Sequence, residues 1–338
     1  MTDNTDTGGP PKIAALDLPE IRRHVLQYLG GTNLVNCMQL NKAWQEEAVP
    51  VLWSRINLNR PPPIAELRRS GSLIRTLNMG YLDVAWPVYS TLEIPNLRGL
   101  AFSFVPTNGD KTSELFQRHT LLTQVDLWDT KCTFEGSAHA SQLWEAMASL
   151  PNLRKLNLLN FTLTDNIDLL PPLSNLQSLV MQHVDFAEMS LNAQMQLMAR
   201  CPALEILEWK PTLKVSGKGP IAIKLFARMV KAGTWPKLQG LTLGWSLNGC
   251  LDEDIASILE AMPRVSILAL PASKFGPLSF EKLRAHFLTL RELGLEHSHR
   301  LTKAMVTEVL ASCPRLSSAS WARLTVHPAY THVSAAQK

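Results

Sequence analysis

The sequence contains no long hydrophobic run. No uninterrupted apolar stretch among its 338 residues approaches the roughly 18 residues that a membrane-spanning helix needs. Residues 1–12, MTDNTDTGGPPK, are polar and lack the apolar segment of a secretory signal. We therefore expect a soluble protein of the cytoplasm, the nucleus or both, without a membrane partner.

The sequence also has few cysteines and only a small net charge. Five cysteines at irregular spacing do not form a disulfide framework and indicate a reducing compartment. The formal net charge is +4, and the basic residues are spread along the chain without a basic run or a basic patch with interleaved aromatic residues. This distribution predicts no nucleic-acid partner.

Motifs of catalysis and of cofactor binding are missing as well. The sequence has no phosphate-binding P-loop, no dinucleotide fingerprint and no nucleophile elbow. Cys132 is near His119 and His139 in sequence only, which does not define a nucleophile. Asp252 to Asp254 lie at the expected start of a helix, where acidic side chains interact favourably with the helix dipole. We expect no enzyme and no cofactor.

One pair of histidines leaves a weaker alternative open. His297 and His299 follow a predicted strand beside Glu296, but no further cysteine or carboxylate set completes a coordination sphere. Solvated histidines in a loop are the favoured interpretation, and we expect no metal. A hydrolase or metal enzyme in the loops would require both histidines to converge with a carboxylate.

What the chain does contain is a repeated unit. In its clearest copy, Leu290 to Leu316, the pattern Leu-x-x-Leu-x-Leu predicts a short strand with Leu293 and Leu295 on the buried face. The following residues carry apolar side chains at helical spacing, and Pro314 ends that helix. One strand and one helix cannot bury their apolar surfaces alone, so such units stack on one another.

Ten copies of the strand pattern follow one another at an average of about 27 residues, inside the range of roughly 20–29 for leucine-rich repeats. Six copies share a proline just before the strand. We therefore predict an α/β fold, a horseshoe-shaped leucine-rich-repeat solenoid over residues 73–326, followed by a polar tail over 327–338. The copies begin at Ile74, Leu97, Leu122, Leu153, Leu176, Leu204, Leu238, Val265, Leu290 and Leu316.

The N-terminal part differs from the repeats. Residues 1–14 form a polar tail, and residues 15–53 predict three short helices. Asp17 is a candidate cap of the first helix, Asn41 caps the third, and Pro50 ends it. Residues 54–72, which contain consecutive prolines, predict a stiff linker to the solenoid.

The helical segment resembles an F-box, the motif that docks on a Skp-type adaptor. The resemblance rests on Leu18-Pro19-Glu20-Ile21, on the break at Gly30-Gly31 and on Leu40-Asn41-Lys42-Ala43-Trp44. Together with Cys201-Pro202 and Cys313-Pro314 it is similar to F-box proteins of the fungal type with cysteine-containing leucine-rich repeats. Asn41 departs from the cysteine that many members carry there. The ladder position after each strand, often Cys or Asn, departs as well, for example at Ser273 and Ser298.

This resemblance implies a substrate receptor of a Skp–cullin–F-box ubiquitin ligase, with the adaptor, and through it cullin and RING subunits, as partners. The solenoid would bind a target protein for ubiquitination. A ligase-independent protein-interaction scaffold, in which the helices only cap the solenoid, is the alternative. The residues that the resemblance places at the adaptor are Leu18, Pro19, Ile21, Val25, Leu26, Leu34, Cys37 and Trp44.

The concave sheet face of a solenoid is its usual binding surface. Strand alternation places polar and aromatic side chains on this face. Trp128 is either a binding anchor or partly covered by a neighbouring loop. The residues that we expect to contact a target protein are Asp126, Trp128, Lys155, Asn157, Glu208, Lys210, Glu292 and Glu296.

Overall fold

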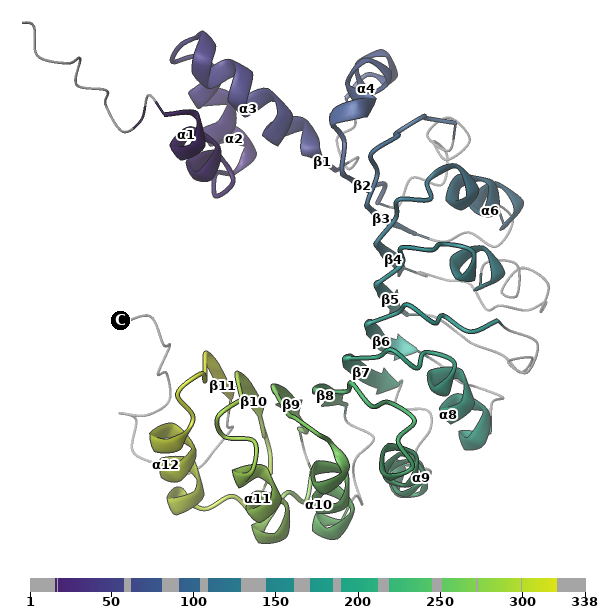
Figure 1. Cartoon of the computed structure of the whole chain (residues 1–338), viewed down its shortest axis with the longest axis vertical. Coiled ribbons are helices and arrows are strands. Elements are labelled where there is room, and N and C mark those ends of the chain that lie inside the picture. Colours follow the sequence, from purple (N-terminus) through teal and green to yellow (C-terminus); the bar gives the residue numbers. More distant parts are fainter. Residues whose placement is uncertain are drawn as a thin grey trace, which may run out of the picture.

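The protein forms a C-shaped arc with strands along its inner side and helices along its outer side (Figure 1). The computed structural model describes residues 16, 18–57, 62–80, 91–103, 109–128, 144–160, 171–184, 190–211, 219–244, 251–271, 273–298 and 300–320. Three helices form one end of the arc, and the last strand and helix form the other. The expected tails, 1–14 and 327–338, lie outside the described residues.

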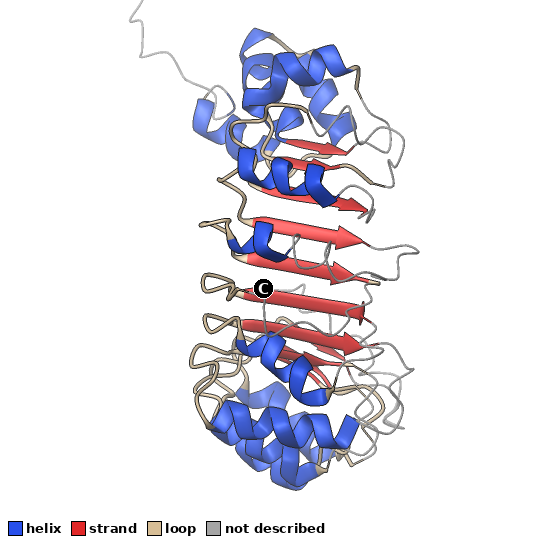
Figure 2. Cartoon of the chain, turned by 90° about the vertical axis from the view of Figure 1, so that its right-hand side faces the viewer, coloured by secondary structure: helices blue, strands red, loops and turns tan. Residues whose placement is uncertain are grey.

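In the described part of the chain, eleven strands form one parallel sheet in sequence order. Figure 2 shows them side by side along the length of the molecule. This arrangement confirms a solenoid-like α/β fold, and each of the ten predicted copies contributes a strand. The strands are β1 (Arg55–Asn57), β2 (Thr76–Asn78), β3 (Gly99–Ser103), β4 (Gln124–Trp128), β5 (Lys155–Leu159), β6 (Ser178–Val184), β7 (Ile206–Pro211), β8 (Gly240–Leu243), β9 (Ile267–Ala269), β10 (Glu292–Gly294) and β11 (Ser318–Ser320).

Helices alternate with these strands on the convex side. Their apolar faces pack on the buried side of the sheet, which completes the two layers that each repeat needs. The described convex helices include α4 (Ile64–Ser70), the 3₁₀ turn η2 (Gly71–Leu73), α6 (Gly109–Arg118), α8 (Leu191–Ala199), α9 (Gly219–Lys231), α10 (Asp252–Ala261), α11 (Pro277–Arg284) and α12 (Lys303–Ser312), and residues 144–148 are helical as well.

The central leucine of each strand pattern forms a buried column through the solenoid. Parallel register places Leu156 beside Leu179, and Leu207 beside Leu241. All four side chains are fully buried. Burial of such a side chain contributes roughly 1.5–3 kcal/mol, and each one packs against its neighbours in the adjacent repeats. The stacking therefore stabilises the arc along its whole length.

The prediction that residues 54–72 form a linker outside the solenoid is wrong. Strand β1 pairs with β2, with Ile56 opposite Leu77, and α4 buries Leu67 in the solenoid core. The chain thus enters the sheet directly after the third helix. Trp53-x-x-Ile56-x-Leu58 fits the strand pattern about one repeat before Ile74, so the solenoid has an eleventh copy that begins before the prolines.

The N-terminal helices are α1 (Pro19–Leu26), α2 (Gly31–Met38) and α3 (Lys42–Ser54). Asn41 caps α3 as predicted, because its side-chain oxygen accepts a hydrogen bond from the Trp44 backbone N–H at 3.0 Å. Leu18 is the N-cap residue of α1, and Asp17 lies outside the described residues. The predicted helix end at Pro50 is wrong, since α3 continues to Ser54.

The continuation of α3 past Pro50 has a packing reason. Val51 and Leu52 pack against a small core inside the helical segment, whereas Trp53 packs against the solenoid core. Burial of these three side chains offsets the backbone hydrogen bond that Pro50 cannot donate. The last turn of α3 therefore joins the two parts of the chain.

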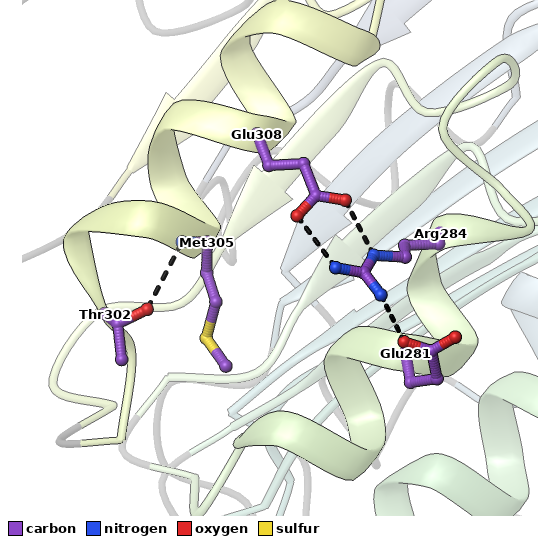
Figure 3. A network of polar contacts seen from close by, with 5 residues as sticks. All are labelled: Glu281, Arg284, Thr302, Met305 and Glu308. Carbon is purple, nitrogen blue, oxygen red and sulfur yellow. Dashed lines mark hydrogen bonds and ion pairs between the residues drawn. The ribbon is translucent and has the colours of Figure 1, made fainter.

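Ion pairs connect the convex helices at the C-terminal end of the arc. Arg284 on α11 donates to both carboxylate oxygens of Glu308 on α12, at 2.6 and 2.9 Å, and also contacts Glu281 (Figure 3). Thr302 accepts a hydrogen bond from the Met305 backbone N–H and caps α12. Because these charged groups are largely exposed, their contribution to stability is small.

Candidate binding surfaces

The helical segment has an apolar core of its own. Leu26, Leu34 and Ala48 are buried together, and this cluster is separate from the continuous core of the solenoid. A bidentate ion pair between Arg23 of α1 and Glu47 of α3 connects the first and third helices. We call residues 18–54 the helical module. Among the described residues of this module, Trp53 packs against the solenoid core, and the other apolar side chains do not.

The residues that the resemblance places at the adaptor differ in their exposure to solvent. Leu18 is 42% exposed and Ile21 is 39% exposed. Leu26 and Leu34, in contrast, are buried in the module core, so they shape the surface from beneath. The remaining four are half-buried; they are Pro19, Val25, Cys37 and Trp44.

Sequence reasoning did not assign three further apolar side chains on the same module. Tyr28 is 76% exposed, Leu40 is 64% exposed, and Val35 of α2 is exposed as well. Tyr28 lies two residues after α1 and continues the three- and four-residue spacing of Ile21 and Val25. This spacing is the sequence signal that could have identified it. The helical module thus exposes several large apolar side chains, a property of surfaces that bind other proteins.

The concave face is organised in rows across the strands. Parallel register places Asp126 of β4 beside Asn157 of β5, followed by Val180 of β6 and Glu208 of β7. A second row places Trp128 beside Leu159. The structure therefore gathers six of the eight expected target-binding residues on β4, β5 and β7. We call the concave face of β4–β7 the central patch.

Asp126 is held by two amide groups in the central patch. Its carboxylate accepts hydrogen bonds from Gln124 Nε2 at 2.9 Å and from Asn157 Nδ2 at 2.5 Å. Burial raises the pKa of Asp126 above its ordinary value, and the two hydrogen bonds and the charge of Lys155 oppose this rise only in part. The ionised carboxylate is thus fixed in direction and incompletely solvated.

Glu208 has a similar environment three strands further along, on β7. Its carboxylate accepts a hydrogen bond from Gln182 Nε2 at 2.7 Å and forms an ion pair with Lys210 Nζ at 2.6 Å. The central patch therefore carries two carboxylates and two ammonium groups, those of Lys155 and Lys210. It offers oriented polar groups with no excess of either charge.

Other expected target-binding residues lie apart from this patch. Glu292 is exposed on β10, and Glu296 is half-buried just after that strand.

Within the central patch, Trp128 is half-buried beside Leu159. The chain after Trp128, residues 129–143, lies outside the described residues, so both alternatives for Trp128 stand.

The residues considered for metal or nucleophile chemistry are only partly described. His297 is exposed in a left-handed backbone conformation with φ of 61°, whereas His299, Cys132 and His139 lie outside the described residues. Among the residues that are described, no group of three or more His, Cys, Asp or Glu side chains has the arrangement of a metal site. None of the described helices has the length and apolar character to cross a membrane.

Comparison with models of protein families and with curated proteins finds no match to this chain. The functional interpretation therefore rests on the geometry of the two surfaces, the helical module and the central patch.

Proposed function

We propose that this protein is the substrate-recognition subunit of a Skp–cullin–F-box ubiquitin ligase. In this proposal the helical module is an F-box that binds a Skp-type adaptor, and through it the cullin and RING subunits. The arc is a leucine-rich-repeat horseshoe whose concave face binds a target protein. The complex would act in the cytoplasm or the nucleus.

The separate core of the helical module carries this proposal. A segment that served only as a cap would bury its apolar side chains against the first repeats. Instead, Leu26 and Leu34 form an independent core, while Leu18, Ile21 and Leu40 remain exposed. Exposed apolar side chains on a small folded module support the docking of another protein.

The central patch supports the target-binding half of the proposal. Interfaces discriminate between partners through polar groups whose direction is fixed. The carboxylates of Asp126 and Glu208 are fixed in this way by amide donors on neighbouring strands. The chain itself performs no chemical step in this proposal. It raises the local concentration of target lysines near a conjugating enzyme carried elsewhere in the complex.

Adaptor capture by the full-length chain tests the proposal. We expect the double substitution Leu18→Ala and Ile21→Ala to weaken binding of a purified Skp-type adaptor by at least about tenfold, because truncation of central apolar contacts commonly costs more than about 1 kcal/mol each. Leu288→Ala is the matched control, since Leu288 is also highly exposed but lies between α11 and β10, outside the helical module.

Unchanged adaptor capture by the double variant would contradict the ligase proposal and leave the ligase-independent scaffold. Circular dichroism spectra that match the wild type exclude unfolding of the module as the cause of a loss.

A further inference from the structure

A groove runs along one side of α3 and ends at the first strand of the sheet. It consists of two adjoining hollows that share Gln27, Pro50 and Val51 in their walls. Their volumes are about 620 Å³ and about 470 Å³, within the range of roughly 300–1,000 Å³ that is typical of ligand pockets. We call the two hollows together the α3 groove.

Most of the residues that α3 contributes to the groove lie on one helical face. Glu46 and Glu47, then Pro50 and Val51, then Ser54 follow one another at intervals of about four residues, which is close to one helical turn. Arg55, the first residue of β1, comes directly after Ser54. At about 1.5 Å per residue, the acidic pair and Arg55 are about 13 Å apart along the axis. The groove is therefore an elongated channel with different charges at its two ends.

The middle of the groove is apolar. Tyr28, Leu29 and Leu34 form one wall, and Val51 and Leu52 of α3 form the other. Pro50 cannot donate a backbone hydrogen bond to the carbonyl of Glu46 one turn earlier. These features suit a bulky apolar side chain between two polar ends.

Arg55 marks the positive end. It is exposed, and no ion-pair partner for it occurs among the described residues. At the other end, Glu47 is paired with Arg23. Glu46 is only 3.8 Å from Lys42 in an exposed pair along the same helix, and such pairs are weak. Arg23 itself also lines this end of the groove, so Glu46, in the weaker of the two pairs, is the carboxylate available to a basic partner.

We propose that the α3 groove binds an extended segment of the target protein that carries a basic side chain, an apolar side chain and an acidic side chain in alternation. An extended chain rises about 3.3 Å per residue, so the distance of about 13 Å places the two charged side chains four residues apart. The apolar side chain between them enters the middle of the groove, and successive alternate side chains share one face of an extended chain.

The groove is continuous with the concave sheet. Arg55 is the first residue of the strand row that continues with Thr76 and Gly99. A target that covers the central patch can thus place a neighbouring segment in the α3 groove. The inference rests on the proposed function in one respect only, namely that the occupant belongs to the bound target.

Fluorescence anisotropy with labelled peptides and the full-length protein tests this inference. The probe is Gly-Lys-Ser-Leu-Ser-Asp-Gly, and its control is Gly-Ser-Lys-Leu-Asp-Ser-Gly, which has the same composition but places the charges two residues apart. We expect the probe to bind at least about tenfold more tightly, a difference of about 1.4 kcal/mol.

Charge reversal in the protein provides a second measurement. Arg55→Glu should weaken probe binding by about tenfold, and a peptide with lysine at both charged positions should regain that loss. Arg75→Glu, at an exposed arginine in the next repeat that does not line the groove, should leave probe binding unchanged. Absence of probe binding, equal binding of the two peptides, or no effect of Arg55→Glu would overturn the proposal.

Adaptor capture separates this inference from the ligase proposal. Arg55→Glu should retain wild-type adaptor capture, because Arg55 is the first residue of β1 and is distant in the chain from Leu18 and Ile21, the exposed side chains that the ligase proposal places at the adaptor. Loss of capture would assign the groove to the adaptor surface and overturn the inference. Probe binding by a protein that captures no adaptor would instead contradict the ligase proposal and leave the groove assignment intact.

Discussion

Ser273 Oγ and Ser298 Oγ lie 3.2 Å apart in the buried interior of the arc. Each serine comes three residues after the last strand leucine of its repeat, Leu270 and Leu295. These are the ladder positions at which the sequence departs from cysteine or asparagine. The serines nevertheless provide a buried hydrogen bond between two successive repeats.

The first prediction concerns this serine pair. Ser298→Ala should lower the free energy of unfolding by about 1 kcal/mol, because it removes a buried hydrogen bond and leaves Ser273 without this partner. A double-mutant cycle with Ser273→Ala, measured by urea unfolding, should give a coupling of similar size. Ser318→Ala, at an exposed strand serine, is the control. Additive single effects would show that the pair contributes no coupling.

Asp252 connects α10 to the start of α11. Its buried carboxylate accepts hydrogen bonds from the backbone N–H groups of Gly276, Leu278 and Ser279 at 2.9–3.0 Å, and from Ser279 Oγ. Burial favours a higher pKa for Asp252, but the donors, with Ser279 foremost, outweigh it and hold the pKa below its ordinary value.

The second prediction follows from this cap between repeats. Asp252→Ala should destabilise the protein by about 3 kcal/mol, since several donors lose a charged acceptor. The native pKa is lower than the unfolded one, so the stabilisation is complete above about pH 4 and is lost as the pH falls through the native pKa. Urea midpoints of wild type and Asp252→Asn should therefore converge below pH 4. Glu253→Gln, in the same helical turn but exposed, should change the midpoint little, whereas a constant gap at all pH values would contradict the assignment.

The third prediction concerns Asp126 in the central patch. Its pKa is raised by burial, so ionisation disfavours the folded state as the pH rises through the native pKa. Asp126→Asn should stabilise the protein at pH 7 by roughly 0.5–1 kcal/mol, and the gain should vanish below about pH 4. An ionised carboxylate that lowers the stability of the folded protein is expected where the residue serves binding rather than folding. A destabilised Asp126→Asn protein at pH 7 would show that the carboxylate has a structural role instead.

The fourth prediction concerns the cap of α3. Asn41→Ala removes the acceptor for the Trp44 backbone N–H and should destabilise the helical module by about 1 kcal/mol, whereas Asn41→Ser should restore most of this loss. Amide hydrogen exchange should show faster exchange in α3 and unchanged exchange in β4–β8. Equal acceleration along the whole chain would indicate that the module does not open independently of the solenoid.

The sequence by itself determined the repeated architecture. The spacing of Leu153, Leu176 and Leu204 fixes which residues enter the sheet, because a strand with a two-residue period has only one apolar face to bury. Asn41 was likewise identified as a helix cap, since capping depends on local backbone geometry. These features involve short stretches of chain and repeat often enough to be recognised.

Only the tertiary structure decided which apolar residues remain exposed and where the solenoid begins. Leu18 and Leu26 have the same apolar character, yet α2 and α3 cover Leu26 and leave Leu18 partly exposed. Ile56 enters the sheet because Leu77 lies beside it, and α3 continues past Pro50 because two cores receive its last turn. Burial depends on contacts between distant segments, and the pattern along a single segment does not contain that information.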